Sequence, residues 1–304
     1  MIPNENSQIY IELCGGLGNQ LFQYATARTI ADRLGVELVC ITDWFRSKAN
    51  LKNPISPERA FGLKHFMHAR YLAMENLPGH VSNPFTKSNN YVRYKIRKML
   101  VSKYIHAEKK HPFYDDSVHR ISAGMILKGL YQDFRYFQDN EKRIRNDLAF
   151  PPPLNSANAE LADQIQQDRN SISLHFRRTD YLSPMMRESM ATCSMDYYRR
   201  ALCYITKKMG GGKVYLFSDD IEWLRRNARL DYLVQFVDIN DMKNAHFDLY
   251  LQSLCDHNVI ANSTMSWWAA WLNANRSKII CAPKKWWRGE VSHPVPSGWT
   301  LIEN

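Results

Sequence analysis

"IYIELCGGLGNQLFQYATARTIADRLGVELVCITD", residues 9–43, is the stretch that decides the fold. It opens with a short apolar run typical of a buried strand, followed by a glycine-rich turn. Residues 20–35 then have the apolar spacing of an amphipathic helix that ends at Gly35, and residues 36–43 form a second apolar run. Strand, turn, helix and strand in this order predict a βαβ unit with parallel strands.

The same alternation returns in the second half of the chain, after "FPPPLNSANAE" at residues 150–160. Three consecutive prolines cannot continue a helix or a central strand, so we expect a linker near residues 151–158. Strands are predicted at 171–176, 213–218, 234–239, 258–261 and 278–283, and helices at 195–212, 219–228, 244–255 and 262–275. Alternating strands and helices predict a parallel, doubly wound sheet, and therefore two α/β domains, 1–152 and 153–304.

Composition sets the broad class of the protein. Of 304 residues, 45% are hydrophobic and 23% charged, as in globular proteins in general. No apolar run approaches the roughly 20 residues that span a bilayer. The N-terminus lacks a basic flank followed by an apolar core, so no signal peptide is expected. Six scattered cysteines without a CxxC pair are typical of reduced thiols in a cytoplasmic protein.

The net charge of +10 suits a nucleic acid, an anionic membrane surface or a phosphorylated substrate. Part of the excess lies in the basic run 91–110, whose apolar residues have helical spacing. A helix of this kind can lie on an anionic bilayer, and a solvated basic face is the other interpretation. The topology of residues 44–120 is not evident from the pattern.

An unusual polar stretch, "SLHFRRTDYL" at residues 173–182, follows the first strand of the second domain. The period of two along a strand puts His175 and Arg177 on one face, with Arg178 and Asp180 at its end. Two guanidinium groups can neutralise a diphosphate leaving group without a metal. The alternative is an internal ion pair between Arg178 and Asp180.

Three further loops carry polar chemistry at predicted strand ends, where open parallel sheets bind ligands. The glycine loop "GGLGNQL" (15–21) favours an anion at the helix start that follows it. With Asp43 it also resembles a dinucleotide fingerprint, except that Leu21 stands at the third glycine position. A tight structural turn is the remaining interpretation.

The second of these loops, "VYLFSDD" (214–220), places Ser218 and Asp219 at a strand end. Asp219 could accept hydrogen bonds from a base edge or a ribose, and a plain helix N-cap explains the loop equally well. The third, "NVIANSTMSWWAAW" (258–271), starts a helix with four polar side chains where an N-cap needs one, which predicts a phosphate site; they are Asn262, Ser263, Thr264 and Ser266. The tryptophans that follow are interpreted as core.

Several catalytic motifs are absent from the sequence. There is no DxD pair of the kind that holds a divalent cation against a nucleotide sugar, and HExxH, GxxxxGK[ST] and GxSxG are missing too. The pattern therefore predicts an anionic, nucleotide-like ligand bound without metal.

Taken together, "GGLGNQLFQYATARTIA", "HFRRTD", "LFSDD", "NSTMSWWAAWLN" and "KGLYQDFRYF" resemble the bacterial α-1,2-fucosyltransferases of glycosyltransferase family 11. The resemblance runs from about residue 9 to residue 287. It implies a GT-B-like architecture, in which two Rossmann-like doubly wound domains face each other across a cleft. It also implies inverting transfer of L-fucose from GDP-fucose to the 2-hydroxyl of a galactose in an O-antigen-type glycan, without a metal or other cofactor.

By position, the resemblance also assigns residues. Arg177 would hold the β-phosphate of the donor, with Arg178 and His175 beside it. The guanosine side would be met by Ser218 and Asp219, and the phosphates by Asn262, Ser263, Thr264 and Ser266. Gly18 and Asn19 would reach the donor from the first domain, which would be the acceptor side. Whether the last residues pack on the first domain is left open.

The general base and the partners stay less defined. Asp180 and His175 are the candidates for the base, and Asp115 or Asp116 is an alternative. The acceptor is a galactose-containing oligosaccharide, either lipid-diphosphate-linked or soluble. We expect a cytoplasmic enzyme, with peripheral contact to the inner membrane as an option, that does not bind nucleic acid. A transferase for another GDP-sugar, an NAD-dependent oxidoreductase and a basic nucleic-acid-binding protein are the alternatives.

Overall fold

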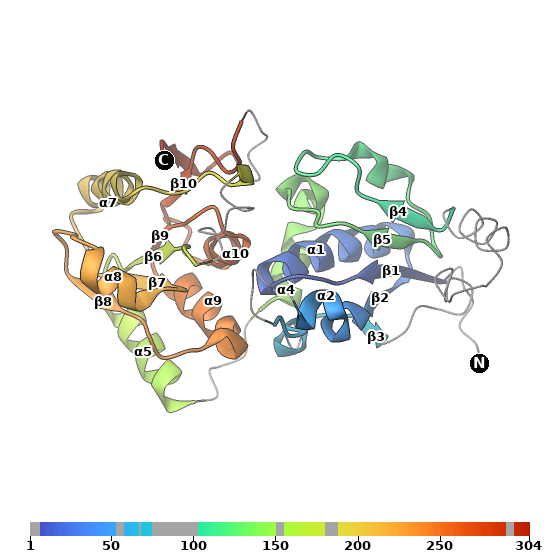
Figure 1. Ribbon diagram of the computed structural model, residues 1–304, viewed down its shortest axis with the longest axis horizontal. Helices are drawn as coiled ribbons and strands as arrows, with labels where there is room; N and C mark the ends of the chain where they lie inside the picture. The colour runs from blue at the N-terminus through green and yellow to red at the C-terminus, as the bar shows by residue number, and fades with distance from the viewer. Residues whose placement is uncertain are drawn as a thin grey trace. The chain divides into compact units, whose positions relative to one another are not determined.

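The computed structural model describes residues 7–52, 58–66, 68–74, 103–149, 155–179, 188–289 and 295–304. The chain divides into two compact units, Met1–Ala149 and Phe150–Asn304. Figure 1 colours the first unit from blue to green and the second from light green to red. Each unit is described by itself below.

The first unit is built on a five-stranded sheet with the order β3-β2-β1-β5-β4, in which every pair is parallel. Its strands are β1 (Gln8–Glu12), β2 (Glu37–Ile41), β3 (Leu72–Met74), β4 (Ile105–Ala107) and β5 (Ile126–Lys128). Its described α-helices are α1 (Leu17–Leu34), α2 (Lys48–Leu51) and α4 (Glu141–Asp147). The predicted βαβ unit is confirmed as β1, α1 and β2. Gly35 caps α1 in the left-handed region, at φ 67°, which glycine adopts without strain.

The second unit holds a six-stranded parallel sheet with the order β11-β10-β9-β6-β7-β8. Its strands are β6 (Ile172–Phe176), β7 (Val214–Ser218), β8 (Val234–Phe236), β9 (His257–Val259), β10 (Ile280–Pro283) and β11 (Thr300–Ile302). Its described α-helices are α5 (Ser156–Gln167), α7 (Met195–Met209), α8 (Ile221–Asn227), α9 (Ala245–Leu254) and α10 (Thr264–Leu272). The last strand completes this sheet, so the end of the chain belongs to the second unit.

Helices cover both faces of the second sheet, as the alternation of its strands requires. Val214 and Leu216 of β7 pack into a core with α7 and α8. Tyr215 and Phe217, the residues between and after them, pack on the other face against α5 and α9. The sheet is therefore doubly wound, as predicted, and its fully buried strands are nearly continuous apolar runs.

Each sheet has one point where its strand order reverses. In the first sheet the chain winds outward from β1 through β2 to β3, crosses to β4 at the opposite edge, and then forms β5 between β4 and β1. In the second it winds from β6 through β7 to β8 and returns beside β6 with β9. Ligands of open α/β sheets bind at the carboxyl ends of the strands at such points.

Some sequence predictions need correction or fall outside the described residues. The basic run 91–110 was predicted as one helix, but residues 105–107 form β4; residues 91–102 lie outside the described part, as do 150–154 of the linker. The helix α5 was not predicted. All six cysteines are free thiols. Within the described residues no helix is both long and apolar enough to cross a bilayer. Contact of the basic run with a membrane stays a prediction.

Candidate active site

The arginine pair lies where β6 ends. Leu174 and Phe176 of this strand point into the core shared with α7, while His175 lies on the opposite face. Arg177 and Arg178 follow directly, at the carboxyl edge of the sheet. Because β6 is flanked by β7 and β9, its end lies between the loops that carry the other two polar motifs of this unit.

Arg177 pairs with Asp219, which follows β7. Its Nη1 lies 3.2 Å from Oδ2 of Asp219, and 18% of the arginine side chain is exposed against 9% of the aspartate. Burial disfavours the charged form of Asp219, but Arg177, Thr179 and the N–H of Arg178 outweigh it and lower the pKa of this carboxyl below its usual value. Asp219 is therefore ionised and fixes the orientation of Arg177.

Arg178 is held from three directions. Its Nε lies 3.1 Å from Oδ2 of Asp220, its guanidinium sits 3.7 Å from the ring centroid of Trp223, and its N–H donates to Asp219 at 2.9 Å. Thr179 also donates to Asp219, through its N–H at 3.2 Å and its hydroxyl at 2.5 Å. The internal ion pair of Arg178 is thus made with Asp220; Asp180, the predicted alternative partner, lies outside the described residues.

His175 is buried, with 7% of its surface exposed. Burial lowers its pKa to about 4, Asp219 acts in the opposite direction, and Arg177 lowers it further. Its Nδ1 has no hydrogen-bond partner within the described part of the chain. A neutral imidazole with so low a pKa is a weak proton acceptor at neutral pH, which argues against His175 as the general base.

The turn after β7 is organised by its own side chains. Ser218 Oγ accepts from the N–H of Asp220 at 3.0 Å, and Asp220 caps α8 by accepting from the N–H of Trp223 at 3.3 Å. Both carboxylates of this turn are thus engaged within the protein. The contact of Ser218 and Asp219 with a guanosine stays a prediction.

At the start of α10 the four predicted side chains have different surroundings. The N-cap is Ser263, yet its side chain makes no capping hydrogen bond. Ser266 is buried and donates to the carbonyl of Ser263 at 3.2 Å. Asn262 is buried and donates to the carbonyls of Ala191 and Trp286, the latter at 3.0 Å. The side chains of Asn262 and Ser266 are therefore engaged within the protein, and phosphate contact by the four residues stays a prediction.

The tryptophans of this helix are core, as predicted, since Trp267, Trp268 and Trp271 are buried. Their ring centroids are 5.1–6.1 Å apart; Trp267 and Trp271 are stacked, and Trp268 meets each of them edge to face. This packing fixes the helix axis, and with it the first-turn N–H groups, which lack intrahelical acceptors.

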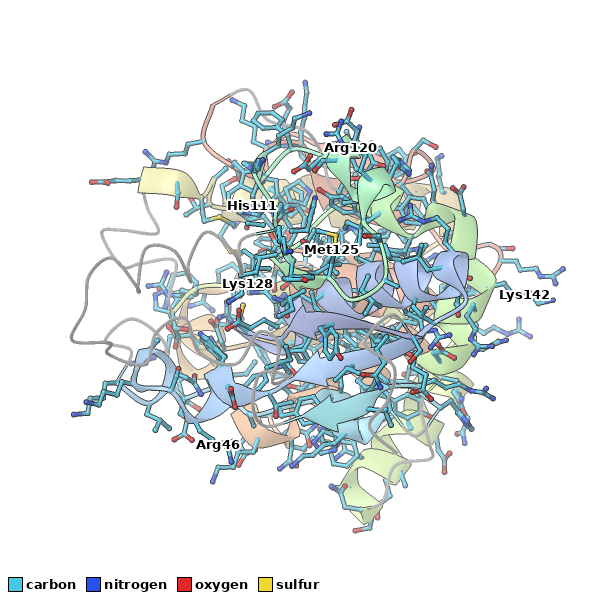
Figure 2. All side chains as sticks on the ribbon, turned by 90° about the vertical axis from the view of Figure 1, so that its right-hand side faces the viewer. Arg46, His111, Arg120, Met125, Lys128 and Lys142 are labelled. Atoms are coloured by element: carbon cyan, nitrogen blue, oxygen red, sulfur yellow. The ribbon has the colours of Figure 1, made fainter. Side chains whose placement is uncertain are left out.

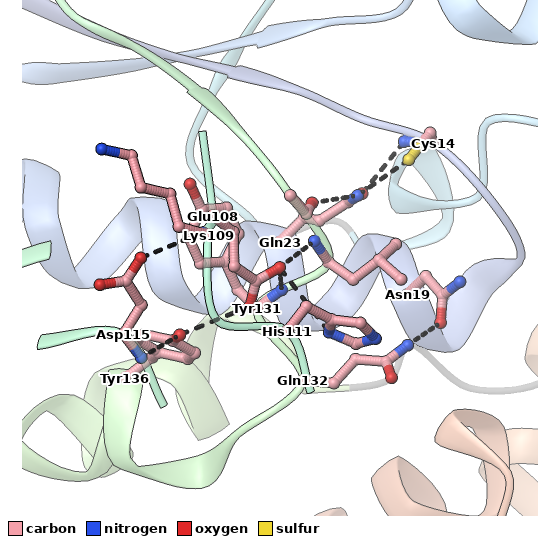
Figure 3. Close-up of polar contacts among 12 residues, drawn as sticks. Cys14, Asn19, Gln23, Glu108, Lys109, His111, Asp115, Tyr131, Gln132 and Tyr136 are labelled. Carbon is pink, nitrogen blue, oxygen red and sulfur yellow. Dashed lines mark hydrogen bonds and ion pairs between the residues drawn. The ribbon is translucent and has the colours of Figure 1, made fainter. Parts of the chain in front are cut away.

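In the first unit, the glycine loop leads from β1 into α1, and hydrogen bonds connect the start of α1 to the segment after β5 (Figure 3). Gly15 has φ 77°, and a Cβ there would lie 2.6 Å from the side-chain nitrogen of Asn19. Asn19 accepts from Gln132 at 2.8 Å, and Gln23 donates to the carbonyl of Gly129 at 2.9 Å. Gly18 is buried within α1. Donor contact by Gly18 and Asn19 stays a prediction.

The two carboxylates proposed as alternative bases are each engaged in contacts within the first unit. Asp115 is 2% exposed and accepts from the N–H groups of Lys109 and Ser117, both at 3.1 Å. Asp116 is exposed and pairs with Lys110 at 3.1 Å. Neither arrangement favours a base role. Asp43, the predicted ribose ligand of the oxidoreductase alternative, pairs with Arg46 at 3.5 Å.

Sequence reasoning missed several residues of this edge. Asp220 and Trp223 hold Arg178, but they are 42 and 45 residues away and only the fold brings them together. Asp248 on α9 accepts from Asn240 at 2.8 Å, and burial raises its pKa to about 7. Among the described residues, no three His, Cys, Asp or Glu side chains are grouped to hold a metal ion.

Comparison with known proteins decides the family. The model of "Glycosyl transferase family 11" matches residues 8–296. The chain belongs to this family. It is a glycosyltransferase, which sets aside the oxidoreductase and nucleic-acid-binding alternatives.

Two curated relatives from Escherichia coli are similar over nearly their whole length. One is the O-antigen biosynthesis glycosyltransferase WbnK, 28% identical over 92% of this chain and 95% of the relative. The other is an alpha-1,2-colitosyltransferase, 28% identical over 98% and 99%. Among solved structures, the NodZ alpha-1,6-fucosyltransferase co-crystallised with GDP matches with a TM-score of 0.51 and 16% identity, over 88% of this chain and 92% of that one. The GT-B type α/β fold predicted from the sequence is thereby confirmed.

Proposed function

We propose that this family 11 glycosyltransferase is an inverting α-1,2-fucosyltransferase that moves L-fucose from GDP-fucose to the 2-hydroxyl of a galactose in an O-antigen-type glycan. The observation that carries the proposal is the arginine pair at the end of β6, held by Asp219 and Asp220. A curated galactoside 2-alpha-L-fucosyltransferase from Caenorhabditis elegans, 30% identical over 52% of this chain, and the O-antigen relative support the donor and the acceptor class.

The proposed reaction is a single displacement at the anomeric carbon of fucose. The acceptor oxygen forms a bond to this carbon while the bond to the β-phosphate oxygen breaks, and the electron pair leaves with GDP. Negative charge grows on the diphosphate, and Arg177 and Arg178 would stabilise it. Only interactions that strengthen in the transition state raise the rate, and fixed donors aimed at developing charge are the strongest of these.

The carboxylates give the arginines their orientation before the donor binds. Two guanidinium and two carboxylate groups leave this cluster without net formal charge, so affinity for a diphosphate would come from directed N–H groups rather than from charge excess. The first turn of α10, with Ser263 and Thr264, would supply further donors to the phosphates. Preorganisation of this kind lowers the cost of reorienting dipoles during the reaction.

Metal independence is part of the proposal, since charged side chains would do what a divalent cation does at a DxD site. The enzyme would work in the cytoplasm, and it would reach a lipid-diphosphate-linked acceptor at the inner membrane.

A second donor has a specific observation in its favour. The alpha-1,2-colitosyltransferase relative covers 98% of this chain, and colitose is L-fucose without its 3-hydroxyl. A site that hydrogen-bonds this hydroxyl discriminates strongly against the sugar that lacks it, whereas a site that does not bind it accepts both.

The test is a thermal-shift screen with EDTA present, against GDP-fucose, GDP-colitose, GDP-mannose, UDP-galactose and NAD⁺, followed by NMR linkage analysis of the product from β-galactosides. We expect the two GDP-6-deoxysugars to stabilise the protein and fucose to appear in α-1,2 linkage. Preferential turnover of GDP-colitose would show that the transferred sugar is colitose rather than fucose. Stabilisation by UDP-galactose alone would overturn the proposal.

A further inference from the structure

The first unit contains a histidine–carboxylate pair at the carboxyl edge of its sheet, formed by His111 and Glu108 (Figure 3). His111 is also labelled in Figure 2. We propose that His111, oriented by Glu108, takes the proton from the acceptor hydroxyl, and that residues 108–113 form part of the acceptor site. This inference rests on the proposed function, because it assigns the missing base of that reaction.

The pair lies at a strand end where ligands of parallel sheets bind. β4 ends at Ala107, and Glu108 continues it by donating its N–H to the carbonyl of Lys128, the last residue of β5, at 2.8 Å. β5 is the strand at which the order of this sheet reverses. The side chains that follow β4 and β5 therefore share the edge where a ligand is expected.

Glu108 is a buried carboxylate in a fixed position. Only 3% of its side chain is exposed. Its Oε2 accepts from the N–H groups of Leu130 and Tyr131, at 2.8 and 3.1 Å, and Oε1 accepts from the hydroxyl of Tyr136 at 3.4 Å. These donors compensate the burial of the polar side chain and fix its orientation.

The segment that contacts Glu108 contains a strained residue and a closely packed glycine. Tyr131 has φ 51°, in the left-handed region that a bulky residue rarely adopts. At Gly129, a Cβ would lie 2.5 Å from Cβ of Glu108. Backbone strain of this kind is concentrated at functional sites.

His111 lies between this carboxylate and the surface. Its Nδ1 is 3.8 Å from Oε2 of Glu108, and 28% of its side chain is exposed. That distance is longer than a hydrogen bond, but catalytic contacts often shorten only when substrate binds. A carboxylate behind an imidazole orients the ring and stabilises the imidazolium that forms when it takes a proton.

The protonation state of His111 suits a base. Burial lowers its pKa below the usual value of 6.5, and Glu108, the charged group that acts on it among the described residues, opposes this shift. The imidazole is therefore neutral at pH 7 and can accept a proton. Two residues further on, Phe113 is 48% exposed, and an exposed aromatic ring offers an apolar face to a sugar.

The proposed step is balanced without a further reactant. The O–H bond of the acceptor hydroxyl breaks as its oxygen bonds to the anomeric carbon of fucose. The proton moves to the imidazole, and GDP leaves with the electron pair of the broken C–O bond. The imidazolium then loses its proton to water before the next turnover.

The test compares His111→Gln with His119→Gln, a matched substitution at an exposed histidine of the same unit. Removing a general base costs about 10²- to 10⁴-fold in rate. We expect kcat for fucosyl transfer to fall by about 100-fold or more in His111→Gln, with GDP affinity unchanged, and to stay at the wild-type value in His119→Gln. A His111→Gln enzyme with wild-type kcat, or with only a raised KM for the acceptor, would overturn the inference.

Glu108 is tested as a positioning residue. In the wild type the rate should fall on the acid side as His111 is protonated, with a midpoint below pH 6.5. In Glu108→Gln the loss of negative charge should move this limb to lower pH, which a merely structural role would not do. Should this variant not fold, NMR titration of the His111 ring in the wild type gives the same pKa, and a value above 6.5 would contradict the account. If the wild type transfers no fucose at all, the proposed function fails; if it does and His111→Gln is fully active, only the inference fails.

Discussion

The carboxyl edges of the two sheets are built alike and carry opposite chemistry. At the second sheet, two arginines follow β6 and each is held by an aspartate from the turn after β7. At the first sheet, a buried glutamate follows β4 and lies behind a half-buried histidine. One edge presents two guanidinium groups, and the other presents an imidazole with a buried carboxylate behind it. The comparison teaches that the same parallel construction can end in side chains of different chemistry.

The largest effect is expected at Arg177. Arg177→Lys keeps the charge but loses the planar fork of N–H groups, and Arg177→Ala loses both. We expect kcat for transfer to fall by about 100-fold or more in each, equivalent to about 3 kcal/mol of transition-state stabilisation. Steady-state kinetics with GDP-fucose and a galactoside measure it.

The matched control for this prediction is Arg199→Lys on α7, an exposed arginine paired with Asp196 at 3.1 Å. Exposed pairs of this kind contribute little, so its kinetics should equal those of the wild type. Nearly full turnover by Arg177→Lys would contradict the role of Arg177 in stabilising the negative charge of the departing GDP.

Asp219→Asn tests whether the aspartates organise the arginine edge. The substitution weakens the contacts to Arg177, Arg178 and Thr179, and we expect the free energy of unfolding to drop by about 2 kcal/mol at pH 7. Because the pKa of Asp219 is lowered in the folded protein, its contribution is present above the unfolded value near 4 and is lost as pH falls through the folded value. Urea unfolding at pH 7 and at pH 3 should therefore show a smaller difference between wild type and variant at the lower pH. An equal difference at both values would mean that ionised Asp219 does not stabilise the fold.

Ser263, the N-cap of α10, and Ser266, in its first turn, separate ligand binding from folding at the same edge. Ser263→Ala removes a hydroxyl that makes no capping bond, so we expect GDP affinity to fall by about 1 kcal/mol with unchanged stability. Ser266→Ala removes a buried, hydrogen-bonded hydroxyl, so stability should fall by about 1 kcal/mol with unchanged GDP affinity. Calorimetric titration with GDP and thermal unfolding distinguish the two. The opposite pattern would exchange the roles assigned to these residues.

The smallest effect on fucosyl transfer is expected at Asp248, a carboxyl of the second unit whose pKa is raised to about 7, chiefly by burial. The folded protein keeps its proton up to a higher pH than the unfolded chain does, so stability declines as pH rises from about 4 to 7. Asp248→Asn should therefore be no more stable than the wild type at pH 4 and more stable than the wild type at pH 8. If the wild type is as stable as Asp248→Asn at pH 8, Asp248 ionises in the folded protein without loss of stability. Asp248 would then not differ from Asp219 in the way described here.

The second unit was largely predictable because its strands and helices are long and regularly spaced. The period along β6 predicted correctly that His175 lies on the face opposite to Leu174 and Phe176. Their partners were not predictable, since pattern reasoning offered the nearby Asp180, whereas the ion pair of Arg178 is made with Asp220, which only the parallel register of β6 and β7 brings close.

The first unit was predictable only as far as its opening βαβ. Beyond it the described strands β3, β4 and β5 have three residues each, too few for a period to emerge from the sequence. The His111–Glu108 pair had no sequence signal, because its geometry depends on the left-handed backbone of Tyr131, twenty residues away. Short strands and strained turns are set by tertiary contacts rather than by local propensity.

The most direct test of the central claim is the rate of fucosyl transfer from GDP-fucose by the wild type and by Arg177→Ala, each measured in EDTA and again with excess Mg²⁺ or Mn²⁺. If guanidinium groups stabilise the departing GDP, the wild-type rate is the same in all conditions, and Arg177→Ala stays about 100-fold slower in each. A wild-type rate that disappears in EDTA and returns with the cation would contradict the account.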